Sequence, residues 1–132
     1  MRKIYLLLFC FSVVFISYYG CKDDITGEDL DRVVIPDTLV SYIKYIQPVF
    51  NLKCAYSGCH DDITRAKGLS LTTWSGARTP GVVNPGDPVS SRLVWAVEGT
   101  GAALMPPLGY PALTVNQIKG IRQWVLEGAK NN

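Results

Sequence analysis

The stretch YIQPVFNLKCAYSGCH, residues 45–60, decides the fold expected of this chain of 132 residues. Apolar side chains recur there and just before it at the three- and four-residue spacing of a helix with one buried face. The recurring positions are Ile43, Ile46, Val49 and Phe50. Because Pro48 is tolerated only near a helix start, the regular helix is predicted to begin around Tyr45. Such a helix delivers Cys54 just past its end.

The N-terminus has the pattern of an export signal. Two basic residues precede an unbroken apolar run over residues 4–16, which is too short to favour a transmembrane helix. Gly20 and Cys21 then resemble the end of a bacterial lipobox, with two tyrosines in place of the usual leucine and small residue. We therefore expect residues 1–20 to be a lipoprotein signal peptide and Cys21 to carry lipid. The mature protein would be exported and lipid-anchored to a bacterial membrane, on its periplasmic face or at the cell surface.

Charge excludes one class of partner. The 13 Lys and Arg, less the two in the signal peptide, balance the 11 Asp and Glu. A neutral mature chain gives no electrostatic argument for a nucleic-acid partner. Residues 21–37 are rich in acids and have no sustained helical or strand period, so they are predicted to form a lipidated acidic tether. Residues 38–132 would then make one small domain.

Helical signals lie at both ends of this domain, and few β signals appear anywhere. Near the C-terminus, Thr114 and Gln117 form a capping box and Gly128 is a helix stop. Between these signals an apolar stripe is predicted at Val115, Ile118, Ile121, Trp124 and Val125. In the middle, only SSRLVWAVEG reads as a helix, capped by Ser90 or Ser91. The expected class is all-α, with long ordered loops.

Two cysteines remain in the domain, because the others are lost with the signal peptide or take the lipid. Cys54 and Cys59 are followed directly by His60, the only histidine. Covalent attachment of haem c needs two thiols and an adjacent histidine, usually as Cys-x-x-Cys-His; here the spacer is the four residues AYSG. The mature chain also has a single methionine, Met105, before two prolines that stiffen its loop. It is the candidate for a second, distal ligand of the iron.

The order of these segments resembles a class I monohaem c-type cytochrome domain of the kind found in bacterial lipoproteins. The resemblance covers nearly all of residues 42–131 and includes GLSLTTW, VVNPGDPVSSRLVWAV, LMPPLG and IKGIRQWVLEGAKN. It implies a cytochrome c-like domain whose N- and C-terminal helices pack near the haem. The site residues it implies are Cys54 and Cys59 for the thioethers, His60 as the proximal and Met105 as the distal iron ligand.

The resemblance also implies finer packing. The two terminal helices would pack closely through a small residue, Gly120 or Ala129, and an aromatic one, Trp124. Walls of the haem pocket fall by position on Leu69, Leu71 and Leu93. The expected function is one-electron transfer between redox partner proteins, without enzymatic activity, through one covalent haem c.

Other interpretations of the same residues stay open. A zinc site would need a further ligand, and Asp61 or Asp62 would strain the geometry because of adjacency to His60. A thiol oxidoreductase normally has a two-residue spacer in a βαβ context. The main alternative is a Cys54–Cys59 disulfide in a haem-free structural or interaction lipoprotein. A haem domain that serves as a subunit or sensor of a larger assembly fits the sequence equally well.

Overall fold

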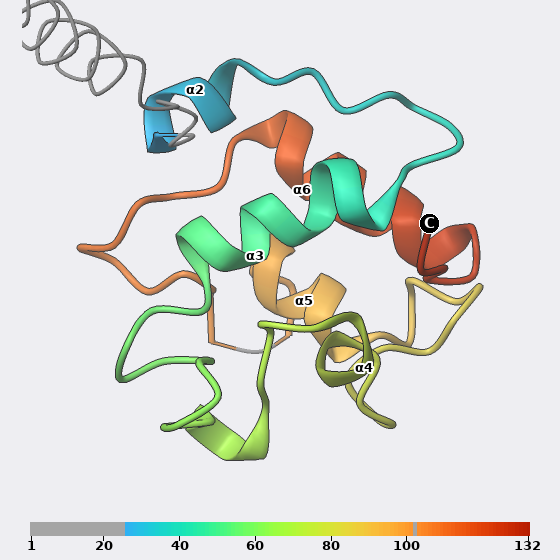
Figure 1. Cartoon of the computed structure of the whole chain (residues 1–132). Helices are drawn as coiled ribbons and strands as arrows, with labels where there is room; N and C mark the ends of the chain where they lie inside the picture. Colours follow the sequence, from blue (N-terminus) through green and yellow to red (C-terminus); the bar gives the residue numbers. More distant parts are fainter. Residues whose placement is uncertain (1–25, 102) are drawn as a thin grey trace, which may run out of the picture.

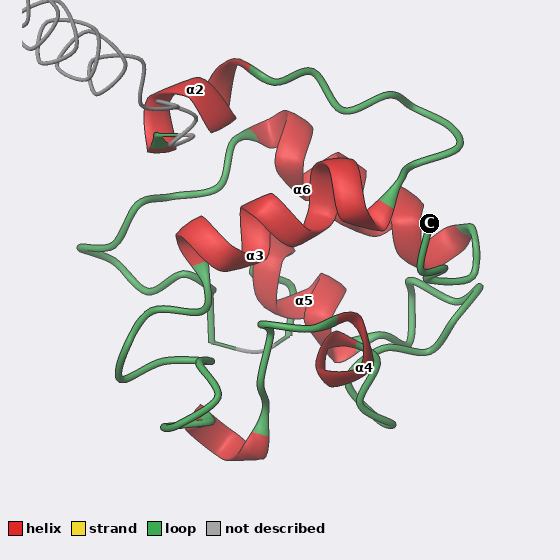
Figure 2. Ribbon diagram, viewed as in Figure 1, coloured by secondary structure: helices red, strands yellow, loops and turns green. Residues whose placement is uncertain are grey.

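The computed structural model describes residues 26–101 and 103–132, and this part of the chain is helical without any strand (Figure 2). The all-α class is thereby confirmed. The predicted signal peptide and the lipidation site at Cys21 lie outside the described residues. The described elements are α2 (Gly27–Arg32), the π-helical turn η1 (Tyr42–Ile46), α3 (Gln47–Lys53), the 3-10 turn η2 (Ala66–Gly68), α4 (Trp74–Ala77), α5 (Arg92–Glu98) and α6 (Val115–Leu126).

The helix that leads to the cysteines starts earlier than predicted. Helical structure begins at Tyr42, where the Ser41 hydroxyl caps the turn by accepting from the backbone N–H of Lys44 at 3.2 Å. The turn η1 runs directly into α3, so Pro48 falls in the first turn of α3, where its missing N–H costs nothing. As predicted, the helix ends at Lys53 and Cys54 is its C-cap.

The last helix follows its sequence signals closely. Thr114 and Gln117 form the predicted capping box, and Gly128, with φ +95°, follows the end of α6. The predicted stripe is right for Ile121, Trp124 and Val125, which are buried, but wrong for Val115, which is 70% exposed. Val115 is the first residue of α6, and the described part of the chain leaves its side chain uncovered.

Three aromatic rings hold the core together where η1, α3 and α6 meet (Figure 1). Trp124 lies with its ring centroid 5.2 Å from that of Tyr42 and 6.2 Å from that of Phe50. All three side chains are at most 2% exposed, and large aromatic groups contribute most of the apolar area that a small domain can bury. The predicted packing of the two terminal helices through Trp124 is thus present.

Residues 26–37 differ from the tether that their composition predicts. α2 is capped by Thr26, and Leu30 and Ile35 are buried in the main core at 3% exposure each. Gly120 of α6 makes room for Ile35, because an added Cβ there would lie 2.7 Å from the Ile35 Cγ2. Gly120 therefore admits the N-terminal segment and not α3, which corrects the role that the resemblance implied for it.

The shorter helix α5 begins after Ser91, one of its two predicted caps. The Ser91 hydroxyl does not cap the helix, because it donates to the backbone carbonyl of Asp87 at 2.7 Å instead. Gly99, with φ +69°, ends the helix in the left-handed conformation that glycine adopts without strain. Within residues 26–101 and 103–132, each helix is too short or too polar to cross a membrane.

Candidate haem-attachment site

The motif CAYSGCH folds into a compact turn at the end of α3. The backbone N–H of Cys54 still bonds to the carbonyl of Phe50 at 2.9 Å, which is the last turn of the helix. The chain then folds back, and the N–H of His60 donates to the Cys54 carbonyl at 3.2 Å. This bond closes the motif on itself, so both cysteines and the histidine belong to one local unit.

The two extra spacer residues are absorbed in a tight turn. The N–H of Cys59 donates to the Tyr56 carbonyl at 2.9 Å, which closes a four-residue β-turn. Gly58, the third residue of this turn, has a φ of +87°, a conformation that glycine adopts without strain. The Asp61 carboxylate accepts from the N–H of Gly58 at 3.1 Å. Hydrogen bonds, first from the backbone N–H of Thr64, lower the pKa of Asp61. Asp61 therefore closes the loop that follows the motif.

The imidazole of His60 has a fixed partner. Its Nδ1 lies 3.3 Å from the Leu69 carbonyl, and the His60 carbonyl accepts from the N–H of Leu71 at 2.8 Å. When Nδ1 donates to a backbone carbonyl, Nε2 carries the lone pair that binds a metal. The segment behind the ring is in turn held to α3, because the Gln47 side chain donates to the Thr72 carbonyl at 3.1 Å.

Both thiols of the motif are free, and neither is bonded to the other. Burial, with the neighbouring Cys59 as a smaller cause, raises the pKa of the Cys54 thiol to about 12. At neutral pH the free Cys54 thiol is consequently protonated. Among the described residues no group of three His, Cys, Asp or Glu side chains is arranged to hold a metal ion, so the zinc interpretation gains no support.

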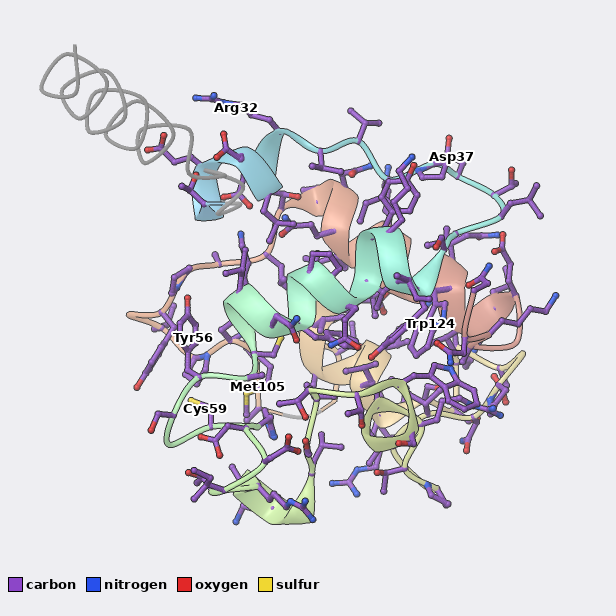
Figure 3. The ribbon with its side chains drawn as sticks, viewed as in Figure 1. Arg32, Asp37, Tyr56, Cys59, Met105 and Trp124 are labelled. Carbon is purple, nitrogen blue, oxygen red and sulfur yellow. The ribbon has the colours of Figure 1, made fainter. Side chains whose placement is uncertain are left out.

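Met105 lies on a separate loop at the same end of the molecule. Figure 3 shows Tyr56, Cys59 and Met105 together at the end away from Arg32 and Asp37. The N–H of Met105 donates to the carbonyl of Ala96 in α5 at 2.9 Å, which attaches the loop to that helix. Among the described residues no hydrogen bond joins Met105 to the motif.

The two loops that carry these residues share an unusual pattern of burial. No described residue in 54–70 or in 98–116 is fully buried, although both segments are folded and contain large apolar side chains. Those that are at least 37% exposed are Tyr56, Ile63, Leu104, Leu108, Tyr110 and Val115. By contrast, the predicted pocket walls Leu71 and Leu93 are buried in the main core, and Leu69 packs against it. The exposed apolar side chains of the two loops therefore lie outside the helical core.

Two surface hollows lie elsewhere. One, of about 300 Å³, is polar and borders the segment between the motif and α4; its lining includes Asp62, Arg65 and Ser70. The other, of about 220 Å³, lies between the N-terminal segment and α6 and includes Ile35 and Lys119. Neither touches the cysteines, His60 or Met105, so neither adds to the candidate site.

Sequence reasoning missed one residue next to the motif. The Lys53 side chain is only 2% exposed, and its ammonium donates to the Asp31 carboxylate and to the carbonyl of Ala112. The only sequence signal was its position beside Cys54, since both partners are distant along the chain.

Comparison with protein-family models, with curated proteins and with solved structures finds no match to this chain.

Proposed function

We propose that this protein is a cytochrome c-like electron carrier that binds one haem c covalently and is anchored to a bacterial membrane through Cys21. The observation that carries the proposal is the closed turn at the end of α3. It holds two free thiols beside His60, whose Nδ1 contacts the carbonyl of Leu69. A backbone carbonyl beside Nδ1 is a usual partner of a metal-binding histidine, because it leaves Nε2 free to bind the iron.

The donor set fits haem c in kind and number. Cys54 and Cys59 would each supply a sulfur that bonds to one carbon of a vinyl group, while the thiol hydrogen passes to the neighbouring carbon, so the additions need no oxidant. His60 would bind the iron through Nε2, and Met105 would supply a soft sulfur on the other side. Met105 is the only methionine of the mature chain, and its loop contains three prolines that limit its freedom.

The exposed apolar side chains of the two loops support the same proposal. A porphyrin is a large, flat apolar group that needs walls which the helical core does not use. Leu104, Leu108 and Tyr56 are exposed by 49%, 93% and 37%, although neighbouring core residues are almost completely buried. Exposed apolar side chains on folded loops are candidates for covering a ligand or a partner.

The ligand set favours electron transfer over catalysis. Haem supplies the cycle between ferric and ferrous iron, and two protein ligands leave no position for a substrate. His60 and Met105 would set the potential, and the loops would exclude water. Redox partner proteins of an electron-transfer chain would deliver and remove single electrons, on the periplasmic face or at the cell surface.

Production of the full chain in bacteria that carry the haem c attachment machinery tests the proposal. We expect haem that stays with the denatured polypeptide and a reduced-minus-oxidised spectrum of a c-type cytochrome. Cys54→Ser and Cys59→Ser should each remove one thioether and shift the absorption of the reduced haem. Cys10→Ser is the matched control, because that cysteine is predicted to leave with the signal peptide. A wild-type protein without covalent haem would overturn the proposal and favour the haem-free lipoprotein.

A further inference from the structure

The buried Lys53 joins three parts of the chain at one point. Its ammonium donates to the carboxylate of Asp31, a residue of α2. It also donates, at 2.6 Å, to the carbonyl of Ala112, which lies shortly before α6 in the chain. The lysine itself is the last residue of α3 and precedes Cys54. A lysine with a 2% exposed side chain is kept only where its charge has partners, so these contacts are a requirement of its burial.

Asp31 is itself held in place by α6. The Gln117 side chain, which is buried, donates to the Asp31 carboxylate at 3.0 Å while its carbonyl oxygen accepts from the N–H of Thr114. The same amide nitrogen lies 3.4 Å from the Leu30 carbonyl. The carboxylate therefore accepts from two side chains on two helices. Its position is determined by α3 and α6 together.

Ala112 is the far end of the loop that carries Met105. That loop is attached to α5 at its start, where the N–H of Met105 donates to the carbonyl of Ala96. Lys53 attaches the other end. Between the two attachments lie Pro106, Pro107 and Pro111, whose rings fix their φ angles and so restrict the backbone of the loop. Ala96 and Lys53 thus attach the two ends of the same short loop.

We propose that Asp31 and Lys53 are positioning residues for the distal ligand: they hold the methionine loop against the helix that delivers Cys54. The inference rests on the proposed function. It makes the N-terminal segment behind the predicted anchor part of the redox site, because Asp31 belongs to α2. A segment that only linked the domain to the membrane would have no effect on the ligand of the iron.

The first test uses haem-free protein and therefore does not depend on the proposed function. Asp31→Asn removes the charge that pairs with Lys53, and Glu28→Gln is the matched carboxylate-to-amide change at an exposed position of the same helix. In Asp31→Asn we expect the Met105 amide, which is bonded to Ala96, to exchange with solvent about tenfold faster, while the amides of α6 around Ile121 keep their rates. Equal acceleration at Met105 and Ile121 would overturn the proposal, because the pair would then only stabilise the whole domain.

The second test uses the haem-bound protein. Ferric iron bound to a methionine sulfur has a weak charge-transfer band that disappears when the sulfur leaves. We expect this band to weaken in Asp31→Asn and in Lys53→Leu, while covalent haem content stays at the wild-type level; Glu28→Gln should keep the band. An unchanged band in both variants would overturn the inference and leave the proposed function intact. Absence of covalent haem in the wild type would instead contradict the proposed function.

Discussion

Gly120→Ala tests whether the N-terminal segment is packed against α6. In the structure an alanine Cβ at this position would lie 2.7 Å from the Cγ2 and 2.8 Å from the Cδ1 of Ile35. Carbon atoms pack without repulsion at about 3.5–4.0 Å, so Ile35 would have to move by roughly 1 Å. Ile35 is buried and its Cβ is also close, at 3.2 Å, so a change of rotamer alone does not make room.

The expected loss is a balance of two effects. Overpacking of this kind costs roughly 1–3 kcal/mol, whereas replacing a glycine inside a helix by alanine gains roughly 0.5–1 kcal/mol. We expect a net destabilisation of about 0.5–2 kcal/mol. A change of 1 kcal/mol shifts the melting temperature of a domain of this size by about 4–8 °C, so thermal unfolding followed by circular dichroism resolves it.

Two variants give this experiment its controls. Gly27→Ala is the matched change, because no atom lies within 4 Å of an added Cβ there and the residue is also helical; its melting temperature should stay or rise slightly. In an Ile35→Ala background, Gly120→Ala should become neutral or stabilising, since the steric conflict is gone. A Gly120→Ala protein as stable as the wild type would refute the packing of Ile35 and restore the tether that the sequence predicts for residues 21–37.

Two further predictions concern the site. Because burial raises the pKa of Cys54 to about 12, iodoacetamide should alkylate this thiol slowly at pH 8 in the folded, haem-free protein. The alkylation rate should increase as the pH rises toward 12. Rapid modification at pH 8, detected by peptide mass analysis, would mean that the thiol is not buried. Met105→Ala in the haem-bound protein should lower the reduction potential and open the iron to external ligands. If a redox titration finds the potential unchanged, another group or water is the distal ligand.

Local chemistry explains which parts of the fold the sequence predicts. The capping box of Thr114 and Gln117 and the stop at Gly128 lie within the helix they bound, so no distant residue is needed to recognise them. The position of Cys54 after α3 follows from an apolar period and one proline in the same way. In each case the partners of the hydrogen bond or contact are at most four residues apart.

Long-range contacts explain what the sequence does not predict. Asp31 and Lys53 are 22 residues apart, and Lys53 and Ala112 are 59 apart, so no periodicity connects them. Composition makes the segment around Asp31 look like a solvated linker, because it is rich in acids and has no sustained helical or strand period. Only the fold shows that Leu30 and Ile35 reach the core and that one of the acids pairs with a buried lysine.

The two groups of apolar side chains show why the candidate site is harder to predict than the core. Tyr42, Phe50 and Trp124 find one another within the chain, so their packing follows from helix pattern and size. Leu108 and Tyr110 have no such partner, since the described residues around them leave both mostly exposed. If haem covers these two side chains, no sequence pattern reveals their partner, because the partner is not an amino acid. What the sequence can encode is the means of attachment that we propose, namely the closed turn from Cys54 to His60, with Met105 on a separate loop as the second ligand.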